Sequence, residues 1–165
     1  MEIRAKTTSD DEKFLKFYEK LALENNSQLL TPKEMSEYIS KQEKQLENKH
    51  KYQQIFIATE GDEIIGFIAL KHIHFEKIRH IAKISLGVLK EYQEKENVGA
   101  KLVEYLENWA EENNIKRLEI LVLDEDDKLE DLLDDLDFHK EGKRKHTIKI
   151  KDKYHDEKIM VKEVG

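Results

Sequence analysis

The feature that most constrains the fold is a strand-loop-helix unit in the middle of the chain. Residues 81–89 are mostly apolar, residues 90–97 are mostly polar, and an amphipathic run opens at Val98-Gly99-Ala100. A helix start leaves unpaired backbone N–H groups, which can bind an anion. The unit therefore predicts a phosphate site at this helix start, or only a tight packing contact, because glycine in a first turn also serves packing.

A second strand is predicted soon after that helix. The helix is expected over about 98–112, with Asn113-Asn114 at its end, and residues 116–123 are apolar enough for a central strand. A strand, a helix and a strand over this length imply a parallel pair with a right-handed crossover. The helix start then lies at the edge of that pair.

The remaining elements follow from periodicity and turn signals. We expect strands over residues 2–7, 52–59, 63–74, 138–150 and 153–164, the last four forming two hairpins. Two capping boxes, Ser9-Asp10-Asp11-Glu12 and Thr31-Pro32-Lys33-Glu34, predict the starts of two early helices. The apolar stripes of these two helices are Phe14, Leu15, Tyr18, Leu21 and Ala22 in the first, and Met35, Tyr38, Ile39 and Leu46 in the second. A fourth helix, short and within the acidic segment, is expected from the spacing of Leu129, Leu132, Leu133 and Leu136.

These elements predict an α/β (α+β) fold in one domain spanning residues 1–165. Its core is expected to be a mixed, mostly antiparallel twisted sheet of about seven strands with a central parallel pair. About four helices flank the sheet.

Composition limits the function classes. The chain has no cysteine, which excludes disulfides, thiolate metal sites and a cysteine nucleophile. Its start lacks a signal-peptide core and no apolar run is long enough for a bilayer, so we expect a cytoplasmic protein without a membrane partner. Residues 124–137 carry nine acids and one lysine, which is either a solvated face or an acidic rim for a cationic partner. Nucleic acid is not an expected ligand.

The order of elements resembles that of the GCN5-related N-acetyltransferase (GNAT) family. Residues 79–89 are similar to the central strand of the family, and Val98-Gly99-Ala100-Lys101-Leu102 to the end of its acetyl-coenzyme A loop. Residues 132–138, LLDDLDF, take the place of the family segment LYEKLGF, and residues 143–160 match its closing hairpin. The resemblance covers nearly the whole chain.

The resemblance implies transfer of an acetyl group from acetyl-CoA, as co-substrate, to a primary amine of a small molecule or protein. Acetyl-CoA would be wedged where the central strand splays from the next one, with its pyrophosphate on backbone N–H groups of the loop. The implied binding residues are Leu86, Val88, Leu89, Glu94, Lys95, Glu96, Asn97, Val98, Gly99, Ala100 and Asp126. The acidic segment favours a cationic amine, and the family leaves a homodimer open.

Several positions depart from the family pattern. Leu133 stands where the family usually has the tyrosine that protonates the thiolate, Lys83 where many members have an acid, and Asp126 where an asparagine often contacts the pantetheine. Asn97 replaces the first glycine of the loop, where asparagine can keep the left-handed turn. Asp137 replaces the glycine before Phe138, which predicts an altered turn.

The expected catalytic groups must therefore come from elsewhere. His80, His72 and His74 are candidate bases, because neutral imidazole transfers protons near pH 7. Tyr154, like Tyr92, offers a hydroxyl, although half-exposed histidines and packed tyrosines are ordinary. No metal site is expected, because the His72/His74 pair lacks a third ligand. The alternative is a catalytically silent module that binds CoA or regulates.

Overall fold

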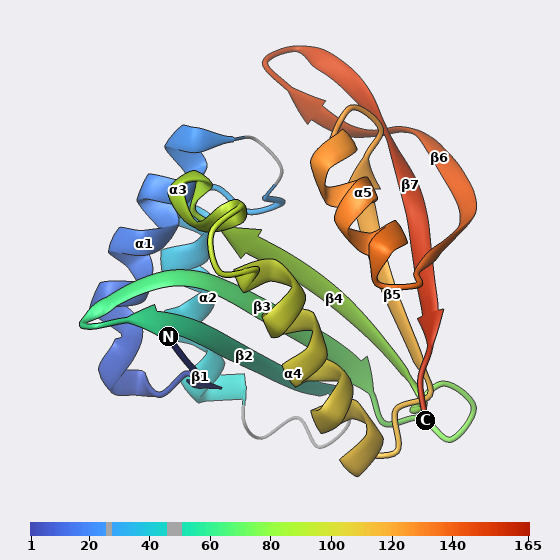
Figure 1. Cartoon of the computed structure of the whole chain (residues 1–165), viewed down its shortest axis with the longest axis horizontal. Coiled ribbons are helices and arrows are strands. Elements are labelled where there is room, and N and C mark those ends of the chain that lie inside the picture. The colour runs from blue at the N-terminus through green and yellow to red at the C-terminus, as the bar shows by residue number, and fades with distance from the viewer. Residues whose placement is uncertain (26–27, 46–50) are drawn as a thin grey trace.

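The computed structural model describes residues 1–25, 28–45 and 51–165, and its strands form one sheet in the order β1-β2-β3-β4-β5-β7-β6 (Figure 1). The strands are β1 (Glu2–Ala5), β2 (Lys51–Glu60), β3 (Glu63–Ile73), β4 (Ile81–Val88), β5 (Arg117–Leu123), β6 (His139–Ile150) and β7 (Lys153–Glu163). The helices are α1 (Asp11–Glu24), α2 (Pro32–Gln45), α3 (Lys90–Gln93), α4 (Val98–Glu112) and α5 (Asp127–Asp135), with a 3-10 turn, η1 (Thr8–Asp10).

The predicted sheet is confirmed. Seven strands pair antiparallel except β4 and β5, which are parallel, with α4 as the crossover between them. The prediction of about four helices missed α3, a single turn within the segment expected to be a polar loop. No helix in the described part of the chain combines the length and apolar character that a membrane crossing needs.

Helices cover both faces of the sheet. Helices α1 and α2 lie on one face and α4 and α5 on the other (Figure 1). On the first face Phe67 of β3 meets the rings of Phe14 and Phe17 at centroid distances of 5.6 and 6.0 Å. Phe17 was not part of the predicted stripe, which placed the apolar face of α1 slightly too far toward Leu15 and Ala22. Burial of such rings is a major contribution to the core.

The second core cluster lies between the sheet and α4. It includes Val98, Leu102 and Leu106 of α4, at the spacing predicted for a helix face, together with Leu133 of α5. On α2 the predicted Met35 and Ile39 are buried against the first face, whereas Leu46 lies outside the described residues. The two clusters together cover both faces of β3, whereas the buried side chains of β4 belong to the cluster under α4.

The helix starts were predicted with mixed success. At α2 the capping box is confirmed, because Thr31 N–H donates to Glu34 Oε1 (3.0 Å) and Glu34 N–H donates to Thr31 Oγ1 (3.2 Å). The box predicted at Ser9 is wrong. Thr7 N–H donates to Asp10 Oδ2 (2.8 Å), so the chain turns two residues earlier, through η1, before α1 begins.

The turn after α5 keeps a left-handed residue. Asp137 has φ +67°, and Phe138 N–H donates to the Leu133 carbonyl across the turn (2.9 Å). Asp137 thus keeps the positive φ that glycine favours, and an altered turn relative to the family stays a prediction. Aspartate tolerates the left-handed region at a cost, since its short polar side chain is among the few that visit it.

Candidate functional site

The two parallel strands separate halfway along their length. Strand β4 pairs with β5 only from Ile81↔Arg117 to Ile84↔Ile120. Beyond that point β4 stays on β3 as far as Val88, and β5 stays on β7 as far as Leu123. A wedge therefore opens between β4 and β5 from Ser85 onward, as the splay expected from the resemblance requires.

The edge of β4 that faces the wedge is defined by its hydrogen bonds. The carbonyls of Leu86 and Val88 accept bonds from the side-chain amides of Gln28 (3.1 Å) and Gln93 (3.2 Å). Because backbone groups alternate along a strand, the N–H groups of Leu86 and Val88 point the same way. This edge can pair with an extended ligand as an added strand does.

Leu89 differs from the two residues predicted with it. Its N–H donates to the Ile65 carbonyl of β3 (3.0 Å), and its side chain is buried in the core cluster under α1 and α2. Leu89 therefore faces away from the wedge. The sequence alone could not show this, because it does not tell which edge of the strand pairs with β3 and which edge faces the wedge.

The loop before α4 makes a left-handed turn. Glu96 and Asn97 have φ values of +60° and +51°, so the turn predicted at Asn97 is confirmed and extends to Glu96. Helix α4 then starts at Val98, where the first N–H groups have no acceptor inside the helix. A Cβ on Gly99 would lie 2.9 Å from Leu132 Cδ2, so the packing explanation of this glycine holds.

Two cavities of about 830 Å³ each open on the two sides of the wedge. The first, called here the wedge cavity, is lined by Leu86–Val88, Gln93, Glu94, Gly99 and the first turns of α5. The second, called the sheet-face groove, lies over β4, β5 and β7 on the face opposite α4. Residues 28–32 and β6 form its walls. Leu86, Leu123 and Gln28 line both cavities, so the cavities adjoin.

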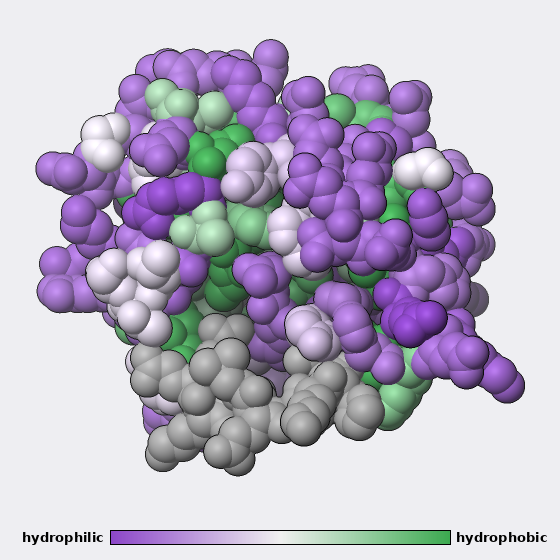
Figure 2. All heavy atoms as spheres, turned by 90° about the horizontal axis from the view of Figure 1, so that it is seen from below, coloured by the Kyte–Doolittle hydropathy of each residue, from purple (hydrophilic) through white to green (hydrophobic). Residues whose placement is uncertain are grey.

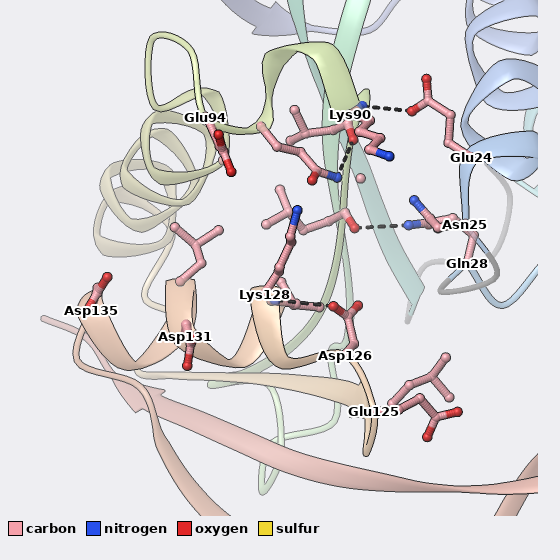
Figure 3. Close-up of a pocket in the computed structure, with 18 of the residues that line it drawn as sticks. Glu24, Asn25, Gln28, Lys90, Glu94, Glu125, Asp126, Lys128, Asp131 and Asp135 are labelled. Atoms are coloured by element: carbon pink, nitrogen blue, oxygen red, sulfur yellow. Dashed lines mark hydrogen bonds between the residues drawn. The ribbon is translucent and has the colours of Figure 1, made fainter.

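Acidic side chains surround the wedge cavity. Among its described lining residues, six carboxylates face two lysines. Figure 3 shows Glu94 on the α4 side and Asp131 and Asp135 on α5, with Lys128 extending from α5 toward β4. The carboxylates are Glu24, Glu94, Glu125, Asp126, Asp131 and Asp135, and the lysines are Lys90 and Lys128. Four of the nine acids in the acidic segment seen in the sequence thus line the wedge cavity.

Asp126 and His155 hold the lower wall of this cavity. Asp126 begins α5 as its cap, with Oδ1 accepting the N–H of Leu129 (3.2 Å), and burial raises the pKa of its carboxyl. His155 of β7 pairs through Nδ1 with Glu125, and only 17% of its side chain is exposed. Sequence reasoning missed His155 and Gln28, which enter the site only through the pairing of β7 and the approach of α1.

The structure brings together part of the predicted binding set. The predicted residues Leu86, Val88, Glu94, Gly99 and Asp126 line the wedge cavity. Lys95, Glu96, Asn97, Val98 and Ala100 form the turn and helix start beside it and are not among the lining residues. Their contribution to binding stays a prediction that rests on backbone groups.

The predicted bases lie at the other end of β4. His72 is 6% exposed, packs 6.2 Å from the Trp109 ring, and has its pKa lowered by burial and then by the charge of His74. The His80 carbonyl accepts the N–H groups of Lys116 and Arg117 just before β4 begins. From there to Leu86 is about 20 Å at 3.3 Å per residue. A catalytic role for either histidine stays a prediction, and this separation argues against it.

Two further predicted positions have clear surroundings. Tyr154 is 57% exposed near the β6–β7 turn, beside the ring of His146 (5.9 Å), and lines neither cavity. Leu133, at the position of the family tyrosine, is fully buried in the core. Among the described residues, neither Tyr154 nor the position of Leu133 therefore supplies a tyrosine hydroxyl to the wedge.

Solved structures share this fold. The chain is similar to a GNAT-family acetyltransferase from Streptococcus pneumoniae (TM-score 0.80, 23% identity, 99% of each chain covered). It is also similar to ribosomal-protein-alanine N-acetyltransferase from Brucella melitensis (0.79, 16%, 99% of this chain and 100% of that one). A third is the phosphinothricin acetyltransferase from Sinorhizobium meliloti in complex with AcCoA (0.78, 15%, 99% and 88%). These likenesses define the fold as that of the GNAT acetyltransferases.

The sequence match agrees with the fold. The family model described as "Acetyltransferase (GNAT) family" matches residues 19–138, which is more than half of the chain. No curated protein matches the chain. The chain belongs to the acetyltransferase (GNAT) family, as the resemblance of its central strand and loop predicted.

Proposed function

We propose that this protein is an N-acetyltransferase that moves an acetyl group from acetyl-CoA to a primary amine of a small molecule or protein. The observation that carries the proposal is the open edge of β4, where the parallel pair ends at Ile84↔Ile120 and two backbone N–H groups are left facing a cavity. Family membership and the acetyl-CoA named for a solved relative support the same co-substrate.

The groups of this chain fit the extended part of acetyl-CoA. When bound, acetyl-CoA supplies an acetyl group activated as a thioester. The N–H groups of Leu86 and Val88 would donate to its amide arm, while Gln28 and Gln93 would release the two carbonyls that they now occupy. The start of α4 at Val98 would place unpaired N–H groups and the positive end of the helix dipole near its phosphates.

The side chains around the wedge cavity are less favourable to phosphates. Glu94 on one wall and Asp131 and Asp135 on α5 repel anions, and Lys90 and Lys128 offset only part of that charge. With Leu133 buried in the core, the leaving thiolate would depart without a tyrosine proton donor at that position. These observations favour a second candidate function, a catalytically silent GNAT module that binds CoA weakly or regulates.

Two measurements separate the candidates. Thermal unfolding with acetyl-CoA, CoA and ATP tests binding, since a ligand at about 100 times its Kd adds about 2.7 kcal/mol to the free energy of unfolding. Free-thiol release across a panel of amines then tests transfer. We expect a rise in Tm with acetyl-CoA but not with ATP, and thiol release with at least one amine. Binding without release on any amine, or no rise in Tm with acetyl-CoA, supports the silent module and contradicts the transferase.

A further inference from the structure

We propose that the sheet-face groove binds a zwitterionic amine of the α-amino-acid type with an apolar side chain, its ammonium at Glu157 and its carboxylate at Arg144 and Lys83. The inference deepens the proposed function, on which it rests, by naming the class of acceptor. It also replaces the expectation of a cationic acceptor, because the acidic segment that motivated that expectation lines the wedge cavity instead.

The ammonium end of the site is a buried carboxylate beside the wedge. Glu157 of β7 is 7% exposed and lines the groove. It stands opposite Leu123, the β5 residue that lines both cavities. The Thr147 hydroxyl donates to Glu157 Oε1 (2.7 Å) and is the partner found for this carboxylate within the described residues. A buried carboxylate with one neutral donor has capacity for a cationic one, and a charge-assisted bond is about twice as strong as a neutral one.

The other carboxylate of the groove is already neutralised. Glu119 of β5 accepts a bond from Arg117 Nε (2.7 Å), and Arg117 also pairs with Glu141. Glu119 therefore adds little attraction for an ammonium. Glu157 is left as the carboxylate that can recognise the amine, at the side of the groove nearest to the open edge of β4.

Cations lie next to both carboxylates without pairing with them. In the strand registers Arg144 is opposite Glu157 and Lys83 is opposite Glu119, so each pair shares a face. No ion pair to Arg144 or Lys83 is found among residues 1–25, 28–45 and 51–165. Lys149, also in the lining, is 3.8 Å from Asp152 at its own exposed turn. Lys151 is also in the lining without an ion pair among the described residues, so the groove offers three uncommitted cations, of which Arg144 and Lys83 lie beside the carboxylates.

The remaining lining suits an apolar body. Leu29 is 78% exposed and Leu121 is 42% exposed, and both border the groove together with Ile148 and Ile159. Covering such exposed leucines with an aliphatic side chain is favourable, because it removes apolar surface from water. The face seen in Figure 2 is instead covered mainly by hydrophilic side chains, with smaller apolar areas between them. A carboxylate free of cations, uncommitted cations nearby and an aliphatic wall together match a zwitterion with a branched side chain.

The test uses three probes that differ by one group each. L-leucine carries both charges, 3-methylbutylamine lacks the carboxylate, and 4-methylpentanoate lacks the ammonium. Titration calorimetry on the whole chain measures binding without any turnover. We expect leucine to bind at least about tenfold more tightly than either analogue, which is the effect of losing one charge-assisted bond.

Substitutions in the groove show which side chain binds the ammonium and which binds the carboxylate of each probe. Glu157→Gln keeps the shape and an acceptor for Thr147, and it should weaken leucine and 3-methylbutylamine about tenfold but leave 4-methylpentanoate unchanged. Arg144→Gln should weaken leucine and 4-methylpentanoate only. Lys140→Gln is the matched control, because Lys140 is on the same strand opposite the core residue Met160 and lies outside the groove lining.

The outcomes separate this inference from the proposed function. Equal binding of leucine and 3-methylbutylamine, no binding of leucine, or a Glu157→Gln variant that binds both as before overturns the inference. Thiol release with 3-methylbutylamine but not leucine overturns it while the acetyltransferase function stands. Leucine binding with the expected variant effects, but no effect of acetyl-CoA on Tm, supports the groove and contradicts the transferase.

Discussion

Two single residues, Asp137 and His72, lie in surroundings that are unfavourable for their side chains. Asp137 adopts φ +67° at the end of α5, where a glycine would pay no steric cost. His72 is buried beside Trp109, and its Nδ1 has no hydrogen-bond partner in the described residues. Each feature predicts a measurable effect on stability.

Replacing Asp137 by glycine should stabilise the protein. A non-glycine residue in the left-handed region costs about 1–2 kcal/mol, and the greater freedom of glycine in the unfolded chain offsets part of that gain. We expect Asp137→Gly to raise the free energy of unfolding by about 0.5–1 kcal/mol in urea titrations. Asp137→Ala should lower it, and a glycine variant less stable than the parent would contradict the turn described here.

His72 should make the protein less stable in mild acid. Burial lowers its folded-state pKa below the ordinary 6.5, so the unfolded chain binds more protons as the pH falls. The contribution of neutral His72 to the free energy of unfolding is therefore fully present above about pH 6.5, and it is lost as the pH falls through the folded-state pKa of His72. Urea titrations of His72→Phe between about pH 7.5 and 5 should show a smaller loss than the parent. A loss as large as that of the parent would place the pH dependence elsewhere, and His139→Gln, at an exposed position on β6, is the control.

At the scale of elements, the start of α4 is where backbone and side chains act in opposite directions. The left-handed turn at Glu96 and Asn97 presents the N–H groups that an anion needs. Glu94, which lines the wedge cavity in front of this turn, opposes the same anion. The helix therefore holds the geometry of a phosphate site with an added electrostatic penalty.

Removing that penalty should tighten cofactor binding. We expect Glu94→Gln to lower the Kd for acetyl-CoA about two- to fivefold at low salt, the range for one charge near a helix terminus, with a smaller gain at high salt. Calorimetric titration gives both values. Glu91→Gln on α3, outside the cavity lining, should change the Kd less, and an unchanged Kd in Glu94→Gln would show that the phosphates bind elsewhere.

At the scale of the whole molecule, the sheet is continuous at one end and divided at the other. The core under α1 and α2 packs against β3, and β4 stays paired with β3, while β5 stays paired with β7. The wedge is thus a property of how two halves of one sheet are packed. Its two cavities have opposite character, acidic on the α4 and α5 side and bearing unpaired cations on the other.

Amide exchange should report this division directly. In the free protein the amides of Leu86 and Val88, which face the wedge, should exchange faster than those of Ser85 and Gly87, which face β3. Acetyl-CoA should slow Leu86 and Val88 selectively, while Ile84 within the paired region stays unchanged. Residue-resolved NMR exchange measures all of these, and equal protection in the free protein would contradict an open edge.

Local pattern carried most of the fold. The periodicity of residues 98–112 and the apolar run at 116–123 predicted α4, β5 and their parallel pairing, because helix and strand faces repeat at fixed intervals along the chain. Asn97 was correctly expected in the left-handed region for an equally local reason. Two short polar stretches were predicted wrongly, the capping box at Ser9 and the segment that forms α3, since neighbouring motifs compete for one turn.

The candidate site was only partly predictable, because its residues meet through register and packing. Leu86 and Val88 could be named from the strand, but only pairing with β3 showed that Leu89 faces the other way. Glu157 and His155 reach the two cavities because β7 adds beside β5, more than thirty residues later in the chain. The amino-acid sequence by itself determined the elements and their order, whose causes are local. Only the tertiary structure decided which charges line which cavity, since that depends on contacts between distant segments.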